Sequence, residues 1–122
     1  MAQTIYEKYG GFSAISRVVM TFYELALESD QIGDYFADVD MARLIDHQTK
    51  FISSLLGGPA SFSDERLEAV HRALAITHDD FDEMGALLKD ALEQHGLSEP
   101  DVRATLAAIE SKRNVIVHRD AA

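Results

Sequence analysis

Apolar side chains recur every three or four residues along most of the chain, the spacing that places them on one face of an α-helix. No run of residues alternates between apolar and polar side chains as a half-buried β-strand does. The repeats predict helices over residues 4–9, 13–29, 41–56, 62–75, 78–95 and 98–117, with a turn-like segment over 31–36. We therefore expect an all-α fold, built as one domain of 122 residues.

Polar residues that can cap a helix stand at several of the predicted starts. Asp40, Ser63 and Thr77 can each accept a free amide of the first helical turn through a side-chain oxygen. Ser98, followed by Asp101 three residues later, resembles a capping box. Glycines end three of the predicted helices, at Gly10-Gly11, Gly57-Gly58 and Gly96.

Composition narrows the classes of protein to which the chain can belong. The absence of cysteine excludes a disulfide scaffold, a cysteine-ligated zinc or iron–sulfur site and thiol catalysis. The formal net charge of −10 disfavours binding to nucleic acid and to anionic lipid. The sequence shows neither a secretory signal nor an apolar stretch of the roughly 20 residues that span a membrane. We expect a cytoplasmic protein that is monomeric.

One histidine lies on the apolar face of a predicted helix. His71 shares the three- and four-residue spacing of Leu67, Val70 and Leu74. A neutral imidazole held in an apolar wall is suited to ligating iron or zinc. The alternative is a structural core histidine that is hydrogen-bonded to a backbone carbonyl.

Three further hydrogen-bonding side chains fall on or beside apolar helix faces. Tyr23 lies at the edge of the apolar face of its helix, and Gln48 stands within the apolar stripe of the next. His47 precedes Gln48 and is spaced to lie near the same buried side. Burying each group without a partner costs roughly 1–3 kcal/mol, a heavy load for a domain whose total stability is about 5–15 kcal/mol. We therefore expect them to converge with His71 on one polar object in an apolar pocket, such as a haem with an iron-bound gas.

Four stretches in a fixed order resemble the group I truncated haemoglobins, which are short globins with a two-over-two helical sandwich. They are YEKYGG, FYELALESDQIGDYFADVDMARL, HQTKFISSLLGGP, and LEAVHRALAIT followed by FD. Together they cover the chain from about residue 5 to residue 95. The resemblance implies a truncated globin fold, a haem b cofactor and binding of dioxygen, nitric oxide or carbon monoxide at iron.

The resemblance also implies roles for individual side chains. His71 looks like the proximal iron ligand, and Tyr23, supported by Gln48, looks like the hydrogen-bond donor to the bound gas. Phe36 looks like the phenylalanine that packs against the haem face. The other side chains expected to border the haem are apolar: Phe22, Leu44 and Phe51.

His47 raises a second possibility at the iron. In one branch of the family, known from cyanobacteria, a histidine directly before the distal glutamine ligates iron, and FADVDMARLIDHQ is similar to that branch's motif. This implies a resting iron held by His71 and His47, with the gas displacing His47. The alternative is a partly exposed histidine beside the haem propionates. That branch also bonds a late histidine covalently to haem, and Ser111 stands at its position here, so we expect no such crosslink.

The most concrete activity implied by the resemblance is nitric oxide dioxygenation, in which dioxygen stabilised by Tyr23 and Gln48 converts nitric oxide to nitrate. Because the sequence contains no flavin or nicotinamide domain, a separate electron-donating reductase must then reduce the iron. An oxygen carrier, store or sensor would use the same residues for affinity alone. A helical interaction protein without a cofactor is a third class, and it would be colourless when purified.

Overall fold

The chain is helical throughout the part that the structure describes. The computed structural model describes residues 3–58 and 76–117. Within these ranges the helices are α1 (Ile5–Lys8), α2 (Phe12–Glu28), the 3-10 helix η1 (Gly33–Phe36), α3 (Met41–Leu55), α5 (His78–Gln94), α6 (Glu99–Glu110) and α7 (Arg113–Ile116). The predicted helix over 62–75, with its cap Ser63 and with His71, lies outside the described residues. None of the described helices is both long and apolar enough to cross a membrane.

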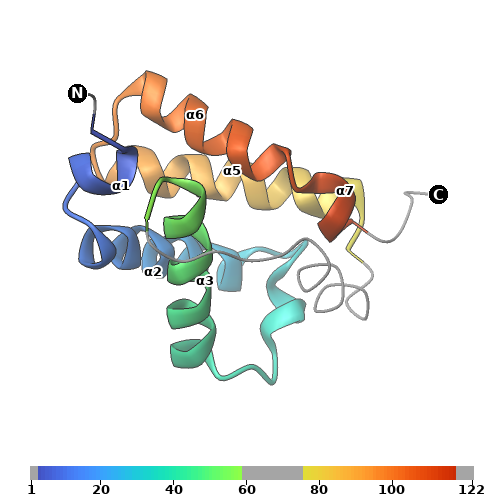
Figure 1. The fold of residues 1–122 in the computed structure, drawn as a ribbon. Coiled ribbons are helices and arrows are strands. Elements are labelled where there is room, and N and C mark those ends of the chain that lie inside the picture. The colour runs from blue at the N-terminus through green and yellow to red at the C-terminus, as the bar shows by residue number, and fades with distance from the viewer. Residues whose placement is uncertain (1–2, 59–75, 118–122) are drawn as a thin grey trace.

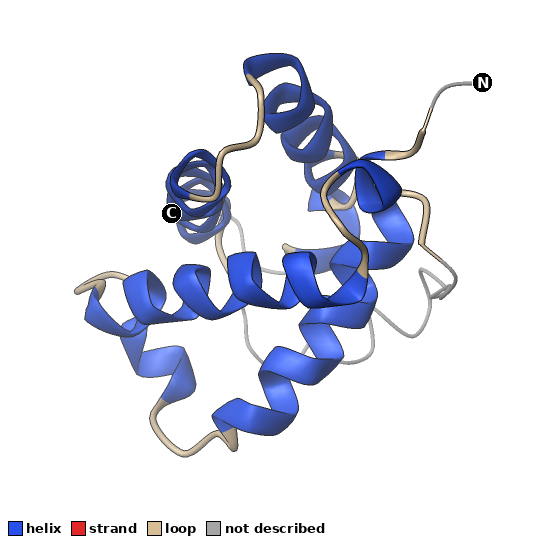
Figure 2. Cartoon of the chain, turned by 90° about the vertical axis from the view of Figure 1, so that its left-hand side faces the viewer, coloured by secondary structure: helices blue, strands red, loops and turns tan. Residues whose placement is uncertain are grey.

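Two helical layers enclose the main core. α5 and α6 run side by side in one layer, while α2 packs against α5 and also against α3, which crosses it (Figure 1, Figure 2). The main core is made of buried apolar side chains from both layers: Ile15, Val18, Val19, Phe22, Tyr23, Ala26, Ile32, Phe51, Ile52, Leu56, Leu88, Ala91, Leu92, Leu97 and Val102. A smaller cluster lies between the start of α5 and α7, and it contains Ile76, Phe81 and Ile116.

α2 forms close to the predicted range, because its apolar residues repeat with the helical spacing. Five of the six residues expected to be buried are so: Ile15, Val18, Val19, Phe22 and Ala26. The sixth, Leu25, is partly buried and packs against the edge of the core. Each fully buried side chain of this size contributes roughly 1.5–3 kcal/mol. The burial of this face therefore holds α2 against both α3 and α5.

The buried face of α3 differs in part from the prediction. Phe51 and Ile52 are buried as expected, whereas the other expected residues are only partly buried: Met41, Leu44, Ile45, Gln48 and Leu55. Thr49 and Ser53 take the most enclosed positions, at 0% and 2% exposed. The Thr49 hydroxyl donates to the carbonyl of Ile45 at 2.6 Å, so its burial leaves no unpaired donor.

Two of the predicted caps are confirmed, and a third residue stands at its predicted position without making the capping bond. Asp40 accepts the amide of Arg43 at the start of α3, and Thr77 accepts the amide of Asp80 at the start of α5. Ser98 stands at the N-cap of α6, but its hydroxyl accepts no amide. Other hydrogen bonds take the place of the capping box. The Ser98 hydroxyl donates to Asp101 Oδ2 at 3.0 Å, and the Ser98 amide donates to the Tyr9 hydroxyl at 3.0 Å.

The predicted continuous helix over 98–117 is also wrong, because it breaks after Glu110. α6 ends there and α7 begins at Arg113. The Ser111 hydroxyl donates to the carbonyl of Ala108 at 2.6 Å, and the amide of Lys112 bonds the carbonyl of Ile109 at 2.9 Å. Side-chain bonds of this kind compete with the helical hydrogen bonds, which explains the break.

The end of α3 is fitted closely against α1. Gly57 has φ +95°, and a Cβ atom there would lie 2.5 Å from Thr4 Cγ2. The amide of Tyr6 donates to the carbonyl of Leu56 at 3.1 Å across the same contact. Only glycine combines this backbone conformation with so close an approach.

Candidate functional site

A buried tyrosine without a hydrogen-bond partner marks the candidate site. Tyr23 on α2 is 5% exposed, and its ring makes edge contacts with Phe22 at 4.8 Å and Phe36 at 5.4 Å between centroids. Its hydroxyl makes no hydrogen bond with any residue in the ranges 3–58 and 76–117. Burial raises the pKa of Tyr23 well above its ordinary value of 10.0, so the phenol stays neutral and keeps its proton. The result is a permanent donor in an apolar setting.

The other apolar residues predicted for the site belong to the same core as Tyr23, on three elements. Phe22 on α2 and Phe51 on α3 belong to the same buried cluster as Tyr23, and Phe36 of η1 and Leu44 of α3 pack against it. The structure thus brings these predicted site residues into one apolar assembly. It forms because α2 and α3 pack against each other through their apolar faces, and η1, the short helix before α3 that carries Phe36, packs against α2.

Gln48 is the second polar group expected at the site. It lies on α3 one turn after Leu44 and is partly buried. Its side-chain amide makes no hydrogen bond with a described residue. An amide held at the border of an apolar assembly retains both its donor and its acceptor for a bound molecule.

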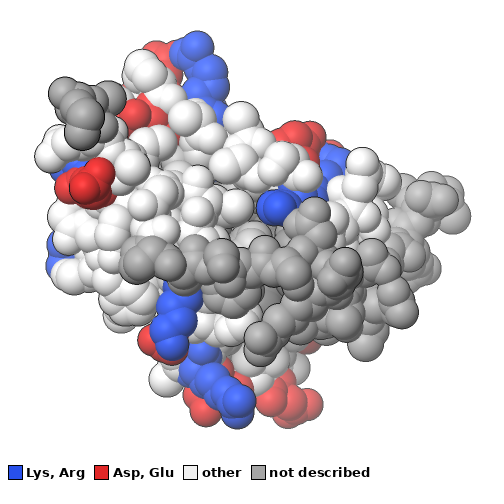
Figure 3. Space-filling view, in the orientation of Figure 1, with Lys and Arg blue, Asp and Glu red and all other residues white. Residues whose placement is uncertain are grey.

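His47 does not lie where its spacing predicts. The side chain is exposed, so the expectation that it lies near the buried side is wrong for this structure. Its neighbours Asp46 and Lys50 are also exposed and form an ion pair at 3.0 Å. In Figure 3, acidic and basic side chains stand side by side on the lower side of the molecule, where α3 lies in Figure 1. A residue next to Gln48 is turned by about 100° around the helix axis, which is enough to move it from the stripe to the solvent side.

Comparison with known proteins identifies the family to which these features belong. The model of the bacterial-like globin family matches residues 4–118. The group 1 truncated hemoglobin GlbN of Synechocystis sp. is 34% identical over 120 residues, covering 93% of this chain and 97% of that protein. The chain belongs to the group 1 truncated haemoglobins. The GlbN of Mycolicibacterium paratuberculosis is 33% identical over 106 residues, which cover 87% of this chain and 78% of its own.

Solved structures of truncated haemoglobins share the fold. That of the Tetrahymena pyriformis protein in its Fe(III) form has a TM-score of 0.86 at 29% identity, covering 94% of this chain and 98% of the other. The two-over-two hemoglobin of Synechococcus sp., in the cyanomet state with covalently attached heme, has a TM-score of 0.88 at 26% identity, with 96% and 100% covered. The predicted truncated globin fold is therefore confirmed, and truncated haemoglobins as a family bind haem and gases.

The described residues fit a haem by their chemistry. A porphyrin needs apolar walls, and a gas ligand at its centre needs one or two hydrogen-bond donors. Phe22, Phe36 and Phe51 are apolar side chains that could form such walls, and the Tyr23 phenol and Gln48 amide, which make no hydrogen bond with a described residue, could act as the donors. The predicted proximal ligand, His71, lies outside the described residues.

Sequence reasoning missed the contacts that hold η1 in place. Asp80, in the first turn of α5, accepts hydrogen bonds from the Tyr35 hydroxyl at 2.5 Å and from the Gln31 amide at 3.0 Å. Ser29 donates to Glu83 at 2.8 Å one turn further along α5. The only local signal was an acidic residue in a first helical turn, which predicts a favourable helix-dipole interaction and not a distant partner.

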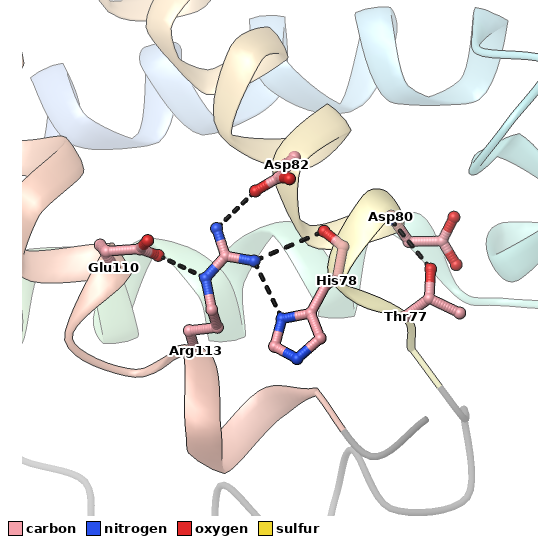
Figure 4. Close-up of polar contacts among 6 residues, drawn as sticks. All are labelled: Thr77, His78, Asp80, Asp82, Glu110 and Arg113. Carbon is pink, nitrogen blue, oxygen red and sulfur yellow. Dashed lines mark hydrogen bonds and ion pairs between the residues drawn. The ribbon is translucent and has the colours of Figure 1, made fainter. Parts of the chain in front are cut away.

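A second group of contacts, around Arg113, ties α7 to α5 and α6. Its guanidinium donates to Glu110 at 2.8 Å, to Asp82, and to His78 Nδ1 at 3.2 Å (Figure 4). It also lies 4.5 Å from the centre of the Phe81 ring. A guanidinium is always protonated, so the His78 nitrogen facing it must be the acceptor. Each of these groups contacts Arg113, and the arrangement therefore serves the packing of α7.

Proposed function

We propose that this chain binds haem b and reversibly holds a diatomic gas, namely dioxygen, nitric oxide or carbon monoxide, at the haem iron. The observation that carries the proposal is Tyr23, a side chain that is only 5% exposed, whose hydroxyl has no hydrogen-bond partner among the described residues and whose pKa is raised by burial. An unpaired buried hydroxyl costs roughly 1–3 kcal/mol. That cost is recovered if the hydroxyl donates to a ligand.

Each residue of the proposed site has one task. Bound haem supplies the iron at which the gas binds. His71 holds the iron from the proximal side, while Phe22, Phe36, Leu44 and Phe51 exclude water and hold the ring. The Tyr23 hydroxyl donates a hydrogen bond toward the gas, and the Gln48 amide supports it. A phenol is already neutral at physiological pH, and the raised pKa of Tyr23 extends the range over which it donates to higher pH.

His47 is proposed as a second iron ligand in the absence of gas. An exposed histidine on the helix that carries Gln48 can change rotamer without disturbing the core. The test is the absorption spectrum of the ferrous protein without added ligand. A low-spin spectrum that becomes high-spin in His47→Ala supports ligation, and a high-spin wild type rules it out.

For the physiological reaction we propose nitric oxide dioxygenation. One nitric oxide, one dioxygen and one electron give one nitrate, and the electron comes from a separate reductase. Tyr23 and Gln48 contribute by holding dioxygen in a pocket from which water is excluded. We expect stoichiometric nitrate from the dioxygen-loaded protein, and sustained turnover with a reductase. Slow or unsustained nitrate formation would instead favour an oxygen carrier, store or sensor.

A further inference from the structure

Asp80 joins α5 to η1 and to the turn just before η1 through its carboxylate. Oδ1 accepts from the Gln31 amide at 3.0 Å, before η1, and Oδ2 accepts from the Tyr35 hydroxyl at 2.5 Å, within η1. The backbone amide of Asp80 donates to Thr77 at 3.0 Å, which fixes the first turn of α5 (Figure 4). Hydrogen bonds to an ionised carboxylate are about twice as strong as those between neutral groups. The charge is retained because hydrogen bonds from Tyr35, Gln31 and Thr77 outweigh burial and lower the pKa of Asp80.

η1 needs such an anchor because it is too short to be stable alone. A four-residue 3-10 helix has poor hydrogen-bond geometry and lacks the length that makes helices cooperative. Within the segment, Ile32 is fully buried and holds the entry to η1. The far end, which carries Phe36, is fixed to α5 by Tyr35 directly beside it.

Among the described residues, Phe36 is one of two whose aromatic rings contact Tyr23. The centroids of Phe36 and Tyr23 lie 5.4 Å apart at an interplanar angle of 83°. The path of contacts thus runs from Asp80 through Tyr35 and the adjacent Phe36 to the ring that carries the proposed gas-binding hydroxyl. The path has three steps: a hydrogen bond from Tyr35 to Asp80, the peptide bond between Tyr35 and Phe36, and the ring contact between Phe36 and Tyr23.

We propose that Asp80 is a positioning residue of the gas site, which fixes η1 and thereby sets how Phe36 holds the Tyr23 phenol. The inference rests on the proposed gas-binding function. Asp80 acts through Tyr23 and does not touch the gas. Loss of the anchor lets η1 and Phe36 shift, so the phenol spends less time in the donating orientation.

The matched control is on the same helix. Glu83 accepts from Ser29 at 2.8 Å, so it contacts the same segment but at its start, six residues before Tyr35. Asp80→Asn and Glu83→Gln each replace a carboxylate by the amide of the same shape, so each removes one charge. Tyr35→Phe removes only the hydroxyl that reaches Asp80, and it preserves a test if Asp80→Asn folds poorly.

The experiment measures dioxygen dissociation by stopped flow from the haem-loaded ferrous protein, in wild-type and Tyr23→Phe backgrounds. Asp80→Asn and Tyr35→Phe should each raise the rate about threefold or more, and Glu83→Gln should not. In the Tyr23→Phe background the effect of Asp80→Asn should vanish, because the residue through which it acts is gone. In the diamagnetic carbonyl form, nuclear Overhauser contacts between the Phe36 and Tyr23 rings should weaken in Asp80→Asn.

Three results would overturn the inference: unchanged rates in both variants, an equal effect of Glu83→Gln, or an undiminished effect of Asp80→Asn in the Tyr23→Phe background. Failure of the proposed function has a different signature. In that case wild type itself does not take up haem, or Tyr23→Phe leaves dioxygen dissociation unchanged while haem is bound.

Discussion

Replacing Tyr23 by phenylalanine separates function from stability at the candidate site. The hydroxyl has no hydrogen-bond partner among the described residues, so its removal forfeits no protein contact there. Loss of this unpaired hydroxyl should leave the free energy of unfolding unchanged or raise it by up to about 3 kcal/mol. If the hydroxyl instead donates to bound dioxygen, a hydrogen bond of about 1–2 kcal/mol is lost. At about 1.4 kcal/mol per factor of ten, dioxygen should dissociate about 5- to 30-fold faster.

The assay mixes the dioxygen-loaded ferrous protein with carbon monoxide and follows the exchange by absorbance, and stability is measured separately by urea unfolding of the haem-free proteins. Tyr9→Phe is the matched control, because the Tyr9 hydroxyl donates to Asp101 at 2.6 Å between α1 and α6. Tyr9→Phe should lower the urea midpoint and leave the dissociation rate unchanged. A Tyr23→Phe protein with the wild-type dissociation rate, or one that is clearly destabilised, refutes the reasoning.

Three further predictions concern stability. The Lys8 ammonium and the Tyr9 hydroxyl lower the pKa of Asp101 to about 2, so this carboxylate stabilises the fold fully above its ordinary pKa of 3.8. The difference in urea midpoint between wild type and Asp101→Asn should therefore narrow as pH falls from about 4 toward 2, and a constant difference would contradict the prediction. Arg113→Lys loses the contact with Phe81 and the paired carboxylates and should cost about 1–2 kcal/mol in thermal unfolding, whereas Arg103→Lys, at the exposed pair with Glu99, should cost under about 0.5 kcal/mol. Gly57→Ala should destabilise by about 2 kcal/mol or more in urea, and more than Gly96→Ala, since both have positive φ but only the Gly57 site meets Thr4; equal costs would exclude the contact as the cause.

Local patterns were sufficient to predict most of the helices. The face of α2 follows from the spacing of Ile15, Val18 and Phe22 alone, and the caps Asp40 and Thr77 depend only on the residues that follow them. The family resemblance singled out Phe36 and Phe51 as side chains that border a haem. Phe51 lies in the main core and Phe36 packs against it, and their role at a haem stays a prediction.

The errors occurred where a distant residue changes a local preference. Ser98 looks like the start of a capping box, but Tyr9, 89 positions away, binds its amide. Asp80 looks like an ordinary first-turn acid, but its carboxylate receives Tyr35 from 45 positions away. His47 shows a different limit, since adjacent helical residues differ by about 100° and spacing alone does not decide which side of a stripe they face. Such pairings depend on how the layers pack, which a single sequence does not encode locally.

The central claim is that this chain holds haem through His71, opposite the Tyr23 phenol. The most direct test is titration of the purified apoprotein with hemin, followed at the Soret band, for wild type and His71→Ala, together with the ferrous spectrum of each. We predict saturation of wild type at one haem per chain, a defined ferrous spectrum that shifts on addition of carbon monoxide, and loss of stable binding in His71→Ala. A wild type that gives no saturable Soret band, or a His71→Ala protein that binds haem as tightly as wild type, would contradict the account.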